Sequence, residues 1–156
     1  MLTSFLDDKA PWAIGIFRIV VGLLFFLHGT TSFFNWPGEP YGGNPEFGAW
    51  PGWWSALIQL VAGLLVMLGV GTRSAAFIGS GSMAVAYFWK HQPDGLFPIE
   101  NDGDSAALFC WALVILVFTG PGKPALDSLL TQFTPSVRAG ASETAENTDK
   151  EAAEVG

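Results

Sequence analysis

Residues 15–34, GIFRIVVGLLFFLHGTTSFF, constrain the fold of this chain more than any other feature. The run is apolar and long enough to cross the hydrocarbon core of a bilayer, which takes about 20 residues of helix. Two polar side chains, Arg18 and His28, interrupt it. We therefore expect a membrane protein, in which the role of these two side chains needs an explanation.

Three further apolar segments follow the first, and the composition agrees with a membrane setting. Only 13% of the 156 residues are charged, whereas soluble domains carry about 25%. Unbroken apolar runs lack the alternation of a barrel strand, and in lipid a helix satisfies its own backbone. The sequence predicts an all-α fold, a bundle of four transmembrane helices over residues 12–34, 53–71, 74–89 and 106–120.

The domain organisation predicted from these segments is simple. Residues 1–11 form an N-terminal segment, residues 12–133 form the membrane domain, and residues 134–156 form an acidic tail. The first apolar run is longer than the apolar part of a signal peptide, so we expect it to be retained. The tail is polar and acidic, and is expected to be disordered.

Lysine and arginine predict the orientation of the bundle. An even number of spans places both termini on one side, and the positive side is normally cytoplasmic. The loop side carries only Lys90 near the membrane, and the terminal side carries the other lysines and arginines outside the spans. Both termini are therefore predicted to be cytoplasmic. The residues that decide this are Lys9, Arg73, Lys123, Arg138 and Lys150.

Several function classes are excluded or disfavoured by the sequence. Cys110 is the only cysteine, so one chain forms neither a disulfide nor a CxxC redox pair. The net charge of −7 and the lack of a basic patch argue against binding nucleic acid. The chain contains no nucleophile triad, phosphate loop or dinucleotide-binding motif. We predict no catalytic residues and no bond-making by this chain alone.

Arg18 is predicted to lie in the cytoplasmic half of the bilayer. It follows Trp12 by six residues, which corresponds to about 9 Å along a helix. Charged residues in membranes normally pair, and Asp7, Asp8 and Asp127 lie on the same side. Two roles remain open, a structural anchor with an ion pair and a contact to an anion or a quinone oxygen.

Five side chains are candidates for a ligand pocket in the opposite half. His28, Gln59, Met83 and Cys110 all fall about 9–10 Å below the outer surface when depth is counted along each span. Tyr87 lies one turn above Met83. If the faces of the four helices converge, we predict that these residues form a pocket for a quinone headgroup or a similar small polar molecule, whose oxygens His28 and Gln59 bond. In the alternative interpretation, the same polar side chains only link helices.

Haem and metal ions are not expected. Ligation of haem by two histidines would require His28 and His91, but His91 lies about 9 Å nearer the surface by the same depth count. Acids in the loop before the fourth span, such as Asp94 and Asp102, match no EF-hand or zinc spacing. No metal site is predicted.

The order of several segments resembles that of a known family. These are Arg18 with GLLFFLHG after it, LIQLVAGLLVMLGVGTRSAA, AYFWKH, and ALFCWALVILVFTGPGKPALD, which together span about residues 14–127. The sequence resembles the DoxX family, small four-helix bacterial membrane proteins related to the membrane subunit of thiosulfate:quinone oxidoreductases.

The resemblance implies a multi-pass protein of the bacterial plasma membrane. It further implies an integral subunit of an oxidoreductase complex, linked to thiol or thiosulfate chemistry or to oxidative stress. Such a subunit would anchor a soluble redox enzyme and bind quinone, with no covalent cofactor. Two other classes remain open, a non-catalytic assembly module and a carrier for a small solute. The sequence does not fix the substrate, the partner proteins or the oligomeric state.

Overall fold

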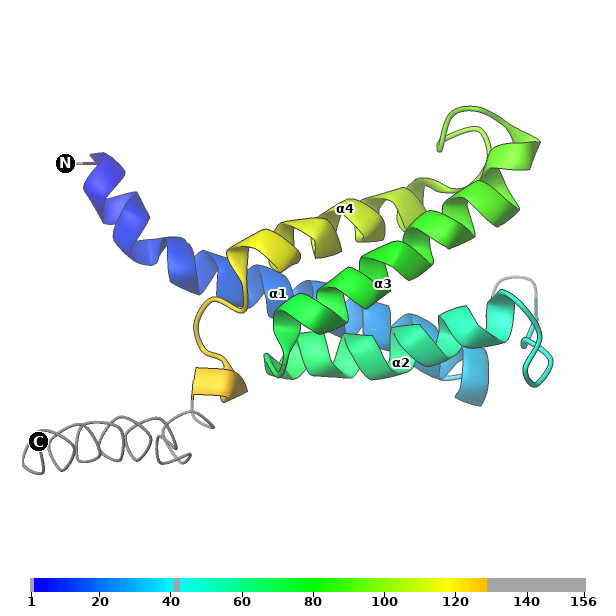
Figure 1. Ribbon diagram of the computed structural model, residues 1–156, viewed down its shortest axis with the longest axis horizontal. Helices are drawn as coiled ribbons and strands as arrows, with labels where there is room; N and C mark the ends of the chain where they lie inside the picture. The colour runs from blue at the N-terminus through cyan, green and yellow to red at the C-terminus, as the bar shows by residue number, and fades with distance from the viewer. Residues whose placement is uncertain (1, 41–42, 129–156) are drawn as a thin grey trace, which may run out of the picture.

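The structure is a computed structural model that describes residues 2–40 and 43–128. Every regular element in these residues is helical, as Figure 1 shows. The predicted all-α class is therefore confirmed for this part of the chain. The elements are α1 (Leu2–Phe34), α2 (Gly52–Leu68), α3 (Thr72–Ala86), the π-helical turn η1 (Tyr87–His91), the 3-10 turn η2 (Gln92–Asp94) and α4 (Asp104–Thr119).

The first helix is longer than predicted. It begins at Leu2, ten residues before the expected start, and continues through Pro11. Apolar patterning did not indicate this extension because residues 2–11 include polar and charged side chains. The backbone oxygen of Pro11 accepts a hydrogen bond from the Lys123 amide at 2.8 Å, so the segment after α4 contacts this part of α1. The predicted tail of residues 134–156 lies outside the described residues.

The helices pack as two antiparallel pairs, α1 with α2 and α3 with α4 (Figure 1). The connections over residues 35–40 with 43–51 and over residues 87–103 lie at one end of the bundle, which we call the loop end. The start of α1, the α2–α3 turn and residues 120–128 lie at the other end, which we call the terminal end. The N-terminal part of α1 extends beyond the other helices.

Glycines allow α1 and α2 to approach closely. A Cβ atom on Gly22 of α1 would lie 2.4 Å from the backbone nitrogen of Met67. A Cβ atom on Gly63 of α2 would lie 2.4 Å from the backbone nitrogen of Phe26. Backbone contact of this kind is typical of helix pairs in membranes. The hydrophobic effect does not drive helices together in lipid, so they associate through close packing, which small residues allow.

The core draws on all four helices. Phe25, Val66, Leu113 and Leu116 are completely buried. Close-packed interiors of this kind fix the relative rotation of the helices, because a rotated helix would leave voids. The core cluster also contains Val21, Ala62, Ala75, Ala76 and Met83.

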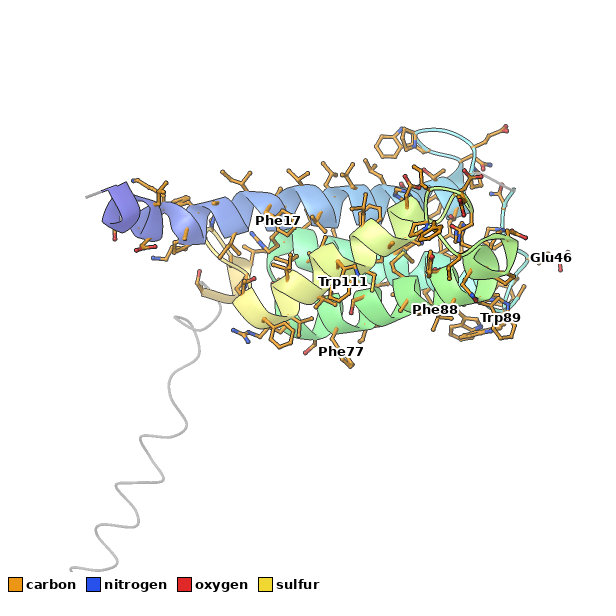
Figure 2. All side chains as sticks on the ribbon, turned by 90° about the horizontal axis from the view of Figure 1, so that it is seen from above. Phe17, Glu46, Phe77, Phe88, Trp89 and Trp111 are labelled. Carbon is orange, nitrogen blue, oxygen red and sulfur yellow. The ribbon has the colours of Figure 1, made fainter. Side chains whose placement is uncertain are left out.

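The outer surface of the bundle is also apolar. Phe77 of α3 and Trp111 of α4 are each 69% exposed, and Phe118 of α4 is 76% exposed. Figure 2 shows Phe77 and Trp89 at the outer edge of the bundle. Within the described residues, residues 6–34 form the one helix that is long and apolar enough to cross a membrane; α2 and α4 are apolar but shorter.

Candidate functional site

Two adjoining cavities lie at the loop end, with volumes of about 490 Å³ and 770 Å³. The smaller lies against α2 and α3, and the larger lies against α1 and the start of α4. Ser32, Gln59, Lys90 and His91 line both of them, so together they form one space whose largely apolar wall carries these shared polar groups. We call this space the loop-end cavity.

His28 of α1 lines the larger cavity. Its Nδ1 lies 2.8 Å from the carbonyl oxygen of Leu24, one turn earlier in the same helix. A carbonyl oxygen only accepts, so Nδ1 donates this hydrogen bond, and the neutral form of the ring would have its lone pair on Nε2. The ring packs edge-on against Phe109 of α4, with 5.1 Å between centroids. These two contacts fix the tautomer and the orientation of the ring.

His91 of η1 lies on the wall of the same cavity as His28. Its Nδ1 lies 2.9 Å from the carbonyl oxygen of Asn101, which again leaves the lone pair on Nε2. Asn101 is buried, and its side chain bonds the Gly95 oxygen at 2.8 Å and the Gly103 nitrogen at 2.9 Å. The hydrogen bonds of Asn101 therefore stabilise the loop before α4 at the point where it contacts His91.

Gln59 of α2 belongs to a small polar network on the cavity wall. Its Nε2 donates to the Ser55 hydroxyl at 3.4 Å, and the Ser82 hydroxyl donates to the same oxygen at 3.3 Å. Ser82 is on α3, so the network joins two helices. Of the five predicted pocket residues, Gln59 is the one that lines both parts of the loop-end cavity.

The other three predicted pocket residues lie elsewhere. Met83 is only 4% exposed and belongs to the core cluster. Cys110 is partly buried against that core, and the Tyr87 hydroxyl donates to the Leu96 oxygen at 3.2 Å. None of the three lines either cavity. Counting residues along a helix gives depth, but it does not give the rotation that decides which side chains meet.

Several residues of the cavity wall were not predicted from the sequence. The usable signal was the pair Lys90 and His91, which are adjacent polar residues directly after an apolar segment. Asp102 and Ser105 also line the larger cavity, from the loop and the first turn of α4. Their position depends on how the loop folds back over the bundle, which local sequence does not reveal.

Arg18 lies at the opposite, terminal end, and is 1% exposed. Its Nη1 donates to the carbonyl oxygen of Val66 at 3.2 Å, and its Nη2 donates to the carbonyl oxygen of Pro124. Gly69 makes room for the guanidinium, because a Cβ atom there would lie 1.9 Å from Nη1. Val66 is in the last turn of α2, where a positive charge complements the helix dipole.

Asp127 is the acid whose charge acts on Arg18, whereas Asp7 and Asp8 are exposed. One Asp127 carboxylate oxygen accepts a hydrogen bond from the Gly71 amide at 2.9 Å. The Asp127 amide donates to the Gly69 oxygen at 3.1 Å. Arg18 and Asp127 together hold the segment after α4 against α1 and the α2–α3 turn, far along the bundle from His28.

Metal ligands do not converge in the part of the chain that the structure describes. No group of three or more histidine, cysteine, aspartate or glutamate side chains there is placed to hold an ion. The neutral wall groups of the loop-end cavity are instead hydrogen-bond donors and acceptors, which suits a small organic molecule.

These features define a small helical membrane protein with an apolar exterior and, in the described residues, a loop-end cavity that has polar groups on its wall. The chain belongs to the DoxX family, whose model matches residues 13–92. It is similar to an uncharacterized protein of Haemophilus influenzae, with 39% identity over 126 residues that cover 79% of this chain and 94% of that protein. No solved structure matches the chain.

Proposed function

We propose that this chain is an integral subunit of an oxidoreductase complex in the bacterial plasma membrane, and that its loop-end cavity binds a quinone headgroup. The observation that carries the proposal is a cavity at one end of the bundle whose largely apolar wall holds a few polar groups, among them His28 and Gln59. Ligand sites are typically concave, with a few convergent polar groups. The chain supplies the binding site, and a soluble redox enzyme supplies the chemistry.

In this proposal all four helices cross the membrane. The 15 residues of α3 continue into the 5 residues of η1, and together they reach about 30 Å at 1.5 Å per residue. The 17 residues of α2 reach about 25 Å, and Trp53 and Trp54 at its start suit the membrane interface. Modest thinning of the bilayer accommodates spans of this length.

The termini are proposed to be cytoplasmic, with the loop end facing outward. Lys9 is in the first part of α1, Arg73 is at the start of α3 and Lys123 follows α4, so all three belong to the terminal end, whereas Lys90 is in η1 at the loop end. An excess of lysine and arginine marks the cytoplasmic side. The quinone site would then lie in the outer half of the bilayer.

The cavity wall suits both redox forms of a quinone. The Nε2 lone pairs of His28 and His91 accept hydrogen bonds from the hydroxyl groups of a quinol. The Gln59 amide and the Lys90 ammonium donate to the carbonyl oxygens of the oxidised form. A site that holds both forms meets the basic requirement of an electron-transfer subunit.

A specific observation also favours an assembly role. Phe47 and Ile99, both in loop-end connections, are 90% and 82% exposed. The same two connections also expose Trp36, Trp50, Leu96 and Phe97, and a group of exposed apolar side chains, unlike a single one, marks a contact with a partner or with the membrane surface. The loop end is therefore the surface on which we propose that a partner enzyme docks. In a pure assembly module the partner would dock there, but the cavity would hold no quinone.

The test is purification of tagged protein in native lipid, followed by mass spectrometry of bound quinone and bound proteins. We expect quinone and a redox enzyme to co-purify with the native chain. His28→Ala and Gln59→Leu should lower the quinone content, while Gln92→Leu, an exposed glutamine that lines neither cavity, should leave it unchanged. Equal quinone in all variants, or none in the native protein, would contradict a quinone site.

A further inference from the structure

A narrow apolar groove runs between α2 and α3, below the loop-end cavity. Its volume is about 250 Å³, and every side chain that lines it is leucine, isoleucine, valine or alanine. On α2 these include Ile58, Val61 and Leu65, at the three- and four-residue spacing of one helix face. On α3 they are Ala75 and Ile78. The groove is thus formed by two facing stripes rather than by scattered residues.

The groove adjoins the loop-end cavity. Ile58 lines both the groove and the smaller cavity. Ser55 and Gln59 lie beside Ile58 on α2, and Ser82 lies one turn from Ile78 on α3. The wall therefore changes from polar to apolar within about one turn of each helix, as the contact surface of an amphiphile would.

The groove is open to the side. Val61 is 50% exposed and Ile78 is 54% exposed, and both are on its wall. It is too small for a protein segment, since one helix about 10 Å wide and 15 Å long occupies on the order of 1,000 Å³. A thin hydrocarbon chain that enters from the bilayer fits these dimensions.

We propose that the groove between α2 and α3 holds the hydrocarbon tail of the quinone whose headgroup occupies the loop-end cavity. This inference rests on the proposed function and adds the route and the class of ligand, a tailed, lipid-soluble quinone. The path from Ser55 to Leu65 spans ten residues of helix, or about 15 Å, which is half of a 30 Å hydrocarbon core. The tail would lie against α2 and α3 down to the middle of the bilayer.

The chain offers closely matched control positions for a test. Ile78 on the groove and Ile115 on the outer face of α4 are 54% and 51% exposed. Val61 on the groove and Val20 on the outer face of α1 are 50% and 49% exposed. Within each matched pair phenylalanine adds the same bulk, but only Ile78→Phe and Val61→Phe fill the groove. Because all four positions are half-exposed, the variants are expected to fold.

The experiment compares two radiolabelled ligands in nanodiscs, a decyl-tailed benzoquinone and the same ring without a tail. Affinities are expressed per mole of lipid, so that partition of the tail into the bilayer is removed. We expect Ile78→Phe and Val61→Phe to weaken binding of the tailed quinone about tenfold, a change of about 1.4 kcal/mol. Binding of the tailless quinone should be unchanged, and Ile115→Phe and Val20→Phe should affect neither ligand.

The outcomes separate the two proposals. If the native protein binds the tailless quinone but Ile78→Phe and Ile115→Phe bind the tailed quinone equally, the groove proposal is wrong and the headgroup site stands. If bilayer phospholipid rather than the quinone tail fills the groove, Ile78→Phe and Ile115→Phe should likewise bind the tailed quinone equally, and the groove proposal is wrong. If the native protein binds neither ligand, the quinone site itself is wrong, and the groove proposal fails with it.

Discussion

The guanidinium of Arg18 in α1 is bonded through Nη1 to the carbonyl oxygen of Val66 in the last turn of α2, 3.2 Å away. The same group bonds the Pro124 oxygen, in the segment after α4. One buried side chain therefore joins three parts of the chain at the terminal end. From this arrangement we propose that Arg18 is a structural tie, a side chain that holds these three segments together.

Replacement of Arg18 by methionine should destabilise the bundle. The change leaves two carbonyl oxygens without their donor and removes the positive charge near Asp127, which together should cost about 2–4 kcal/mol. The free energy of unfolding in mixed micelles, measured by denaturant titration, checks this. Arg73→Met is the control, since Arg73 is exposed and bonds the Val117 oxygen at 3.3 Å. A similarly small effect of both changes would show that Arg18 is not a structural tie.

Alanine should have opposite effects at two helical glycines. At Gly63 the added Cβ meets the backbone of α1, and overpacking of this kind costs about 1–3 kcal/mol. At Gly81 nothing lies within 4 Å of an added Cβ. Gly81→Ala should therefore be neutral or stabilise by about 0.5–1 kcal/mol through helix propensity. Thermal unfolding of both variants in one detergent provides the comparison, and a loss of stability in Gly81→Ala would contradict the helix packing.

Single cysteines should reveal the proposed topology. In a Cys110→Ala background, Glu46→Cys at the loop end should react with a membrane-impermeant maleimide in intact cells. Asp8→Cys should react only after the cells are permeabilised. Both side chains are exposed, and Figure 2 shows Glu46 in the loop beyond the helices. Reaction of Asp8→Cys in intact cells would place the N-terminus outside and overturn the orientation.

Quinone binding should depend on Gln59 but not on Cys110. Gln59 lines both parts of the loop-end cavity, whereas Cys110 lines neither. Gln59→Leu should weaken binding of a tailless benzoquinone about tenfold, because a lost hydrogen bond costs about 1–1.5 kcal/mol. Cys110→Ala should bind as the native chain does. Equilibrium binding in nanodiscs measures both, and weakened binding in Cys110→Ala would mean that the pocket lies nearer the core.

Most of the fold could be predicted from the sequence, and only part of the candidate site. Long apolar runs with glycine and proline between them predicted four helices, because a backbone in an apolar setting must satisfy its own hydrogen bonds. The extension of α1 over residues 2–11 was not predictable from hydropathy, since it includes polar residues. His28 and Gln59 stand out as polar groups in apolar runs. Met83 and Cys110 were predicted at the same depth as His28 and Gln59, but Met83 lies in the core and Cys110 packs against it.

The sequence by itself determined the helical class, the apolar exterior and the unusual polar residues, because these follow from side-chain polarity and local backbone preference. Only the tertiary structure decided which polar residues meet. Helix rotation is fixed by close contacts such as Gly63 against Phe26. Loop packing is fixed by buried hydrogen bonds such as those of Asn101, which bring His91 to the cavity that His28 also lines. Such contacts join residues far apart in the chain, so local sequence patterns cannot specify them.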